Sequence, residues 1–364
     1  MSASNRPLKI NFLIHRPSPS GGARVIARYA RLLKDKGHEV TITGLTPRKL
    51  GMREKLKTLL KSKPPSKSHF DHEGLELNLV ADRMDVRAED LPDADIVIAT
   101  FWITAEWMAL LAPSKGKHVY FVQGHEAALS HVNTARAEKT YRSGAHLITV
   151  SNWLAGILRN QYGRGDAEIV LNAVDADDFA PLAPRKKNSS LVVGFVASNN
   201  AVKRTDIAVA ALEKLKSQIP TLSVRAFSAH SPGEGYDAPS WMNIAVAPSP
   251  EKIREIYGAC DLWLFTSDEE GFGLPILEAF AAGTPVLARP AGAAPDLVTP
   301  QNGALVNSAD PHDIAEEAAR ILSASADDWK KMSDKALDAA QARSWRESAA
   351  EFEAALYRAL DRRQ

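Results

Sequence analysis

Short apolar segments alternate with helix-like segments along almost the whole chain, and this alternation restricts the fold more than any other feature. In the first half, buried strands are expected at residues 10–15, 40–43, 75–81, 95–100, 118–122 and 147–150. The segment that begins at Gly21-Gly22 and ends at Gly37 has apolar residues at helical spacing, and further helices are expected at 133–142 and 152–162. Helices between successive strands make those strands parallel, in a sheet covered on both faces.

The pattern stops at residues 177–190, a charged segment with two prolines that has the composition of a linker. It then starts again, with strands expected at 191–197, 222–227, 244–246, 262–265 and 286–288, a helix at 203–218, and a helical tail over 309–360. The sequence therefore predicts an α/β protein of two doubly wound, Rossmann-like domains, 1–180 and 181–344, that face each other across a cleft. A length of 364 residues agrees with two domains of ordinary size.

Composition excludes several classes of protein. The net charge of +1 argues against a dedicated nucleic-acid binder, whose surface would be strongly basic. The single cysteine, Cys260, can form neither an internal disulfide nor a cysteine-cluster metal site, and it fits a reducing compartment. Neither a signal peptide nor an apolar run of membrane-spanning length is recognisable. A cytoplasmic protein is expected.

One stretch carries the clearest chemical signal, and it runs from Glu270 to Glu278 with the sequence EGFGLPILE. Its glycine-rich turn follows a predicted strand and leads into a predicted helix with Pro275 in the first turn, where proline is favoured. The free N–H groups and the positive dipole end at such a helix start attract an anion, phosphate above all. A dinucleotide fold is rejected because Ile276 occupies the position of the third glycine.

This stretch matches the Glu-x7-Glu motif of retaining GT-B glycosyltransferases, in particular glycosyltransferase family 4, and the chain resembles that family along nearly its whole length. Four other segments match the family's pattern in the same order: SGGARV at residues 20–25, KGHEV at 36–40, NAVD at 172–175 and AGTPV at 282–286. The segments YFVQ at 120–123 and KTYR at 139–142 are also similar to a narrower, rhamnosyltransferase-like branch that builds bacterial surface polysaccharide.

The resemblance implies a role for each matching residue in the second half. Glu278 would accept hydrogen bonds from both ribose hydroxyls of a sugar nucleotide, and catalytic Glu270 would position the donor sugar. Backbone N–H groups of Phe272, Gly273 and Leu274 would hold the distal phosphate. Lys203 would neutralise the departing diphosphate, which gathers negative charge in the transition state. The family needs no catalytic metal, so neither a metal nor another cofactor is expected.

The chain departs from the family in the segment before Lys203. The family has an arginine there, whereas this chain has Ser198 or Asn199. Arg204 is the candidate that would replace this arginine at the donor site. An alternative interpretation is that Lys203 and Arg204 are only a charged pair at a helix start, although cations at that end oppose the helix dipole.

Three further candidates lie in the first half. Gly21 and Gly22 form either a tight turn or a close approach of the backbone to the donor, at the strand end where open α/β sheets bind ligands. His125 matches a family histidine near the donor sugar, and a structural hydrogen bond explains it equally well. Glu126 is a weaker candidate for the acceptor side, with His125.

Residues 48–67 form the remaining unusual segment, with eight basic residues against one acid, Glu54. Four apolar side chains share one helical face, which is the pattern of a basic amphipathic helix on anionic lipid. A solvated surface helix explains the segment equally well. The lipid interpretation predicts peripheral contact with the inner face of the membrane.

The expected function is therefore retaining transfer of a sugar from a nucleotide-diphospho-sugar to a hydroxyl of a glycan or lipid-linked saccharide. A sugar-nucleotide epimerase and a non-catalytic nucleotide-binding scaffold are the alternatives. By resemblance to the family, the C-terminal helix 345–364 is expected to pack back on the N-terminal domain, with Trp345 as its anchor.

Overall fold

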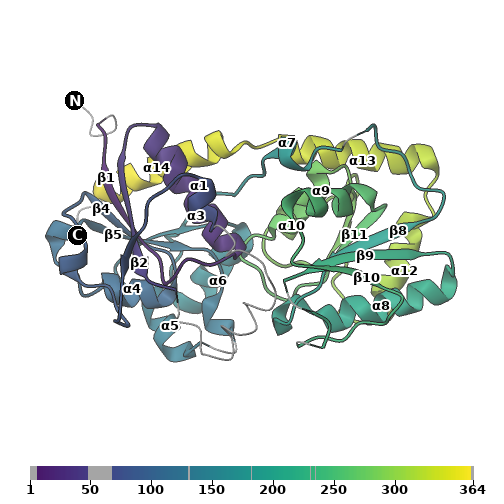
Figure 1. Ribbon diagram of the computed structural model, residues 1–364, viewed down its shortest axis with the longest axis horizontal. Coiled ribbons are helices and arrows are strands. Elements are labelled where there is room, and N and C mark those ends of the chain that lie inside the picture. Colours follow the sequence, from purple (N-terminus) through teal and green to yellow (C-terminus); the bar gives the residue numbers. More distant parts are fainter. Residues whose placement is uncertain are drawn as a thin grey trace, which may run out of the picture. The chain divides into compact units, whose positions relative to one another are not determined.

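A computed structural model of the protein describes residues 6–47, 68–129, 132–181, 183–229, 231–233 and 235–361 (Figure 1). These residues form two compact units. The first unit takes its residues from Met1–Thr149, Ala155–Val170 and Arg346–Gln364, and the second from Val150–Leu154 and Leu171–Trp345. Neither unit is a single continuous piece of chain.

The first unit contains a seven-stranded sheet in the order β3-β2-β1-β4-β5-β6-β7, and every neighbouring pair is parallel. The strands are β1 Lys9–Leu13, β2 Glu39–Leu45, β3 Asn78–Val80, β4 Ile96–Ala99, β5 Lys117–Val122, β6 His146–Thr149 and β7 Glu168–Ile169. Strands β4 and β6 are buried along their whole length, which explains why they read as continuous apolar runs in the sequence.

Helices cover both faces of this sheet. They are α1 Gly21–Asp35, α3 His69–His72, α4 Trp102–Met108, α5 Thr134–Tyr141, α6 Asn152–Tyr162 and the C-terminal α14 Trp345–Asp361, with 3₁₀ turns at Ala88–Asp90, Pro113–Lys115 and Glu126–Ala128. Successive residues of β5 point to opposite faces: Tyr120 stacks on Tyr141 of α5, whereas Phe121 packs on Phe352 of α14. Phe352 also stacks on Tyr29 of α1, with ring centroids 4.6 Å apart.

The second unit contains a six-stranded parallel sheet in the order β10-β9-β8-β11-β12-β13. Its strands are β8 Val192–Val196, β9 Ser223–Ser228, β10 Asn243–Val246, β11 Leu262–Phe265, β12 Val286–Ala288 and β13 Gly303–Leu305. Its helices are α7 Ala176–Phe179, α8 Thr205–Gln218, α9 Pro250–Ala259, α10 Leu274–Ala281, α11 Ala294–Leu297, α12 Pro311–Leu322 and α13 Ala326–Gln341.

Two helix layers enclose the second sheet, with α8 and α12 on one face and α9 and α10 on the other (Figure 1). Val193 and Phe195 of β8 point into a core shared with α8 and α12. Gly194 between them faces α9, where a Cβ would lie 2.4 Å from the Trp263 ring and 2.6 Å from Cys260 Sγ. A glycine is therefore required at this position for the ring of Trp263 to lie against the strand.

The predicted α/β class with two parallel sheets is confirmed. Two strands were not predicted from the sequence, β7 and β13, which have two and three residues. The predicted helix 203–218 was wrong at its start, because Lys203 ends a separate 3₁₀ turn, η5 (Ala201–Lys203), and α8 begins at Thr205. The proposed linker 177–190 contains most of α7, and in it Arg185 is buried, with Nη1 bonded to the Gly258 carbonyl and Nη2 to the Cys260 carbonyl.

The proposed membrane-contact segment 48–67 lies outside the described residues, so its helix and its lipid contact stay predictions. In the part of the chain that the structure describes, no helix is both long enough and apolar enough to cross a membrane.

Candidate active site

In the second sheet the order of successive strands reverses between β8 and β11. Ligands of open α/β sheets bind at the carboxyl ends of the strands beside such a switch point. The loop after β8 leads through η5 to Lys203, and the loop after β11 contains Glu270. The backbone N–H of Asp268 donates to the Val202 carbonyl at 2.8 Å, which ties the two loops together. The sheet therefore brings Lys203 and Glu270 to one edge although 67 residues separate them.

A left-handed residue fixes the end of the β8 loop. Arg204 has φ of 51° and ψ of 48°, which costs a non-glycine residue about 1–2 kcal/mol. The Thr266 hydroxyl holds this turn, because Oγ1 lies 3.1 Å from the Lys203 carbonyl and 3.2 Å from the Arg204 carbonyl. Earlier in the loop, the backbone of Ser198 is bonded through both N–H and C=O to Thr205 Oγ1, and Asn199 is exposed.

The ammonium group of Lys203 forms an ion pair with Glu270 Oε1. The same oxygen accepts a hydrogen bond from Ser267 Oγ at 2.9 Å. The Glu270 side chain is 12% exposed and that of Lys203 is 29% exposed, so the pair is partly shielded from water but still reachable. The predicted catalytic carboxylate and the predicted phosphate-binding lysine therefore lie in direct contact.

The turn between Glu270 and α10 has the features of an anion site. Gly273 is the N-cap of α10 with φ of 93°, and a Cβ there would lie 2.9 Å from the Phe265 ring. Leu274 is the first helical residue, and Pro275, which follows it, has no N–H. The Ile276 N–H donates to the Gly273 carbonyl at 2.9 Å, so the N–H at the helix start that lacks an intrahelical acceptor is that of Leu274. Phe272 is buried, and its carbonyl accepts the N–H of Ala293 at 2.7 Å.

Glu278 lies one turn inside α10 and is 6% exposed. The hydroxyl of Tyr257, on α9, donates to Glu278 Oε2 at 2.7 Å. Tyr257 is itself enclosed by aromatic rings, with the Trp263 centroid 4.3 Å away. Sequence reasoning missed Tyr257, because nothing in the spacing of 21 residues marks it as a partner of Glu278.

Two arginines share one carboxylate beside this turn. Arg204 donates to Asp268 Oδ2 at 2.8 Å, and Arg289, which follows β12, forms an ion pair with Asp268 Oδ1. Partial burial of the Asp268 carboxyl disfavours its charged form, but hydrogen bonds from Arg289 and Arg204 outweigh this and lower the pKa of Asp268. Sequence reasoning also missed Asp268 and Arg289, although both follow predicted strands and the strand-end rule points to such positions.

The candidates of the first half lie together in the first unit. Ser20 caps α1 by accepting the Ala23 N–H at 3.3 Å, and Gly21 and Gly22 open that helix at the end of β1. A Cβ on Gly22 would lie 3.7 Å from Gln123 Oε1, which places the glycine loop next to the loop after β5. In that second loop, His125 Nε2 lies 2.7 Å from the Tyr162 hydroxyl. The structural hydrogen bond offered as an alternative for His125 is therefore present, and its catalytic role stays a prediction.

Glu126 is 5% exposed and bonded inside the first unit. Its Oε2 accepts the Trp102 N–H at 2.6 Å and the Tyr120 hydroxyl at 2.9 Å. Burial raises the pKa of Glu126 to about 8, and these two hydrogen bonds offset only part of the effect. Glu126 thus joins β5 to the start of α4, and its predicted place on the acceptor side stays a prediction.

This burial predicts a pH-dependent stability. The Glu126 proton leaves an unfolded chain near pH 4.5 and the folded protein near pH 8, so the stabilisation is complete below pH 4.5 and is lost as the pH rises to about 8. Between these values, stability should fall by up to about 1.4 kcal/mol per pH unit. Glu126→Gln stays neutral and should flatten this fall, measured by urea unfolding from pH 5 to 9. Glu76→Gln, at an exposed position, should keep the wild-type slope, and parallel curves for all three proteins would contradict the prediction.

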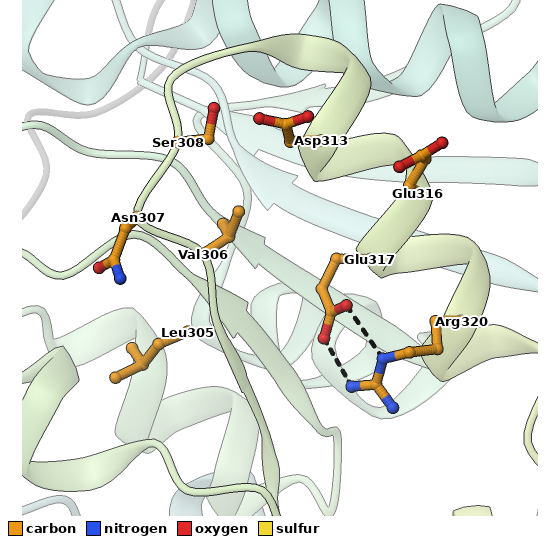
Figure 2. Close-up of a pocket in the computed structure, with 8 residues that line it drawn as sticks. All are labelled: Leu305, Val306, Asn307, Ser308, Asp313, Glu316, Glu317 and Arg320. Atoms are coloured by element: carbon orange, nitrogen blue, oxygen red, sulfur yellow. Dashed lines mark hydrogen bonds and ion pairs between the residues drawn. The ribbon is translucent and has the colours of Figure 1, made fainter.

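A separate surface cavity of about 530 Å³ lies between the end of β13 and α12 (Figure 2). Figure 2 shows Asp313, Glu316 and Glu317 projecting from α12, with Glu317 bonded to Arg320 by two hydrogen bonds. Three acids against one arginine would repel a phosphate, and none of the predicted site residues lines this cavity. The cavity is therefore not the candidate site.

Among the described residues, no group of three or more histidine, cysteine, aspartate or glutamate side chains could hold a metal ion. The prediction that sugar transfer needs no metal stays a prediction, because it concerns the reaction and the absence of a protein metal site from the described residues does not test it.

Solved structures with a similar fold are GT-B glycosyltransferases. Anabaena HepE, crystallised with UDP-glucose, has a TM-score of 0.72 and 18% identity, over 97% of this chain and 99% of that chain. WaaG, a glycosyltransferase involved in lipopolysaccharide biosynthesis, has a TM-score of 0.62 and 15% identity, over 94% and 98%. At these identities the likeness concerns the fold, and it assigns this chain to the GT-B class.

The family follows from the sequence models. This chain belongs to the family 4, group 1 glycosyltransferases: residues 19–178 match the model "Glycosyltransferase Family 4", and residues 190–324 match "Glycosyl transferases group 1". The expected family resemblance is confirmed, while nothing bears on the narrower rhamnosyltransferase-like branch.

Curated relatives share this family. The D-inositol 3-phosphate glycosyltransferase of Stackebrandtia nassauensis is 25% identical over 74% of this chain and 69% of its own length. The enzyme of the same name from Corynebacterium kroppenstedtii is 28% identical over 50% of this chain and 46% of its own length. The chain thus spans about two thirds of the first of these relatives and about half of the second.

Proposed function

We propose that this protein transfers a sugar from a nucleotide-diphospho-sugar to a hydroxyl group, with retention of anomeric configuration. The observation that carries the proposal is the contact between Lys203 and Glu270 beside the start of α10. This arrangement combines a cation for a leaving phosphate, a carboxylate for a sugar hydroxyl, and a helix start that favours an anion. The complex of Anabaena HepE with UDP-glucose supports the choice of donor class.

In this mechanism, the second unit positions the donor and stabilises the departing diphosphate. Backbone N–H groups at Gly273 and Leu274 and the Lys203 ammonium bind the phosphates as negative charge develops on them. Glu270 orients the sugar, and Glu278, whose Oε2 also accepts the Tyr257 hydroxyl, holds the ribose. The departing phosphate takes the proton of the acceptor hydroxyl on the same face of the sugar.

For the acceptor, we propose a hydroxyl of a glycan or lipid-linked saccharide in bacterial surface polysaccharide synthesis, in the cytoplasm or at the inner face of the membrane. The role of WaaG in lipopolysaccharide biosynthesis supports this choice. The names of the curated relatives favour a second candidate, a phosphorylated inositol. Both acceptor types can be offered in the same assay once the donor is known.

The proposal is tested by calorimetric titration with UDP, GDP, dTDP and ADP and with their common sugar conjugates, each with and without Mg²⁺. We expect one nucleotide to bind without metal and to name the donor class. Transfer would then be measured with that donor, and proton NMR of the product would give its anomeric configuration. Failure of all four nucleotides to bind would overturn the proposal.

Two alternative functions remain distinguishable in these assays. A sugar-nucleotide epimerase would convert the sugar of the bound donor without any acceptor. A non-catalytic scaffold would bind a nucleotide and transfer nothing to any acceptor, a result that the absence of charge at Ser198 and Asn199 would help to explain.

A further inference from the structure

The carboxylate of Asp268 contacts arginine side chains from two other loops of the second unit. Asp268 follows β11, Arg204 ends the loop after β8, and Arg289 is the first residue after β12. Because β8, β11 and β12 are neighbours in the sheet, their carboxyl ends meet at one edge. Two guanidinium groups therefore meet one carboxylate, two residues before Glu270 in the chain.

The two arginines differ in how far their donors are used. Arg204 donates from Nε to Asp206 at 3.1 Å, from Nη2 to Asp206 at 2.9 Å and from Nη1 to Asp268 at 2.8 Å. All three of its nitrogens are thus committed to carboxylates. These hydrogen bonds, to Asp206 first and to Asp268 second, raise the pKa of Arg204. Arg204, the residue expected from the sequence to replace the absent arginine, is already neutralised by two acids.

Arg289, in contrast, does not use all of its N–H donors in hydrogen bonds to the described residues. Its Nη1 contacts Asp268 and lies 3.4 Å from the Thr266 carbonyl. Within the part of the chain that the structure describes, its Nε is buried and has no hydrogen-bond partner. A buried donor without an acceptor costs about 1–3 kcal/mol, so its presence points to an acceptor that joins the site.

The loop that carries Arg289 packs directly on the Glu270 turn. Gly292 has φ of 59°, and a Cβ there would lie 2.7 Å from the Phe272 carbonyl oxygen and 2.8 Å from Glu270 Cβ. The Ala293 N–H donates to the same Phe272 carbonyl. Arg289 is therefore anchored, by its own short loop, next to the turn where the proposed function places the donor phosphates.

We infer that Arg289 supplies the second positive charge to the diphosphate of the donor, and that Asp268 holds its guanidinium in place before the donor binds. This inference rests on the proposed function. A nucleoside diphosphate brings more than one negative charge, whereas Lys203 is one cation and is already paired with Glu270. A guanidinium that faces a phosphate can donate two parallel hydrogen bonds, which an ammonium cannot.

The test compares each nucleoside diphosphate, UDP first, with its monophosphate by calorimetry. Arg289→Gln should weaken diphosphate binding about tenfold or more and monophosphate binding by less than about twofold. Arg289→Lys should restore part of the loss. The matched control is Arg320→Gln, which removes a guanidinium paired with Glu317 elsewhere in the same unit and should change neither constant.

A second variant keeps the inference testable if Arg289→Gln is unstable. Asp268→Asn leaves both arginines in place but removes the carboxylate charge that holds the Arg289 guanidinium before the donor binds, so diphosphate binding should weaken, by less than in Arg289→Gln, and monophosphate binding should stay within about twofold of the wild type. Equal losses for diphosphate and monophosphate in Arg289→Gln, or diphosphate binding unchanged in Asp268→Asn, would overturn the inference alone. If the wild-type protein binds none of the four diphosphates, the proposed function fails and the inference fails with it.

Discussion

Replacing Glu270 with glutamine should reduce sugar transfer by about a hundredfold or more and leave nucleotide binding nearly unchanged. Glutamine keeps the size of the side chain and an oxygen that can accept the Ser267 hydrogen bond, so the turn should persist. It loses the charge that orients the sugar and opposes Lys203. In this variant Lys203, which binds the diphosphate, lacks its carboxylate partner. The loss of sugar transfer should appear in kcat rather than in the nucleotide dissociation constant.

The assay is steady-state transfer with the donor that the nucleotide panel identifies, together with circular dichroism to confirm folding. Glu251→Gln is a suitable control, because Glu251 is a fully exposed carboxylate on α9 and should not affect transfer. Turnover of Glu270→Gln within a few fold of wild type would refute the role assigned to Glu270.

Replacing Glu278 with alanine should weaken nucleotide diphosphate binding by about two orders of magnitude or more. A carboxylate that accepts two ribose hydroxyls contributes charge-assisted hydrogen bonds of about 1.5–3 kcal/mol each. The variant also leaves the buried Tyr257 hydroxyl without this acceptor, so some loss of stability is expected. Calorimetry measures the affinity, and thermal unfolding measures the stability separately.

A deoxynucleotide separates ribose recognition from this loss of stability. In the wild type, 2′-deoxy-UDP should bind more weakly than UDP if UDP is the preferred nucleotide, and in Glu278→Ala the two should bind alike. Tyr257→Phe should keep most of the preference for the ribose form, since it retains the carboxylate. If Glu278→Ala still prefers UDP over 2′-deoxy-UDP as the wild type does, another residue binds the ribose 2′-hydroxyl.

The sequence was sufficient to predict the parallel sheets and the segment around Glu270, because long apolar runs and a glycine–proline helix start are local signals. It also placed Lys203 close to a strand end, and the topology then brings that residue to Glu270. The roles of these residues in binding and catalysis stay predictions, as do those of Gly21, Gly22 and His125.

What the sequence could not provide are contacts between distant residues. Asp268 and Arg289 are 21 positions apart, and their ion pair depends on β11 and β12 being neighbours. The burial of Glu126 likewise depends on Trp102 and Tyr120 surrounding one carboxyl oxygen. The two residues of β7 and the three of β13 carry too few side chains for any periodicity to appear, whereas β12, also of three residues, was predicted from its apolar run.

The return of the C-terminal helix to the first unit has a consequence for how this protein is made. Phe352 completes an aromatic cluster with Tyr29 and Phe121, so that cluster stays open while the second unit is being translated. The main part of the second unit, Leu171–Trp345, is translated at about 5–20 residues per second, so this interval lasts roughly 9 to 35 seconds. During it the nascent first unit exposes apolar rings, whereas the second unit has all its strands before α14 emerges. We therefore expect the second unit to reach its native core first, the reverse of the usual order of folding from the N-terminus.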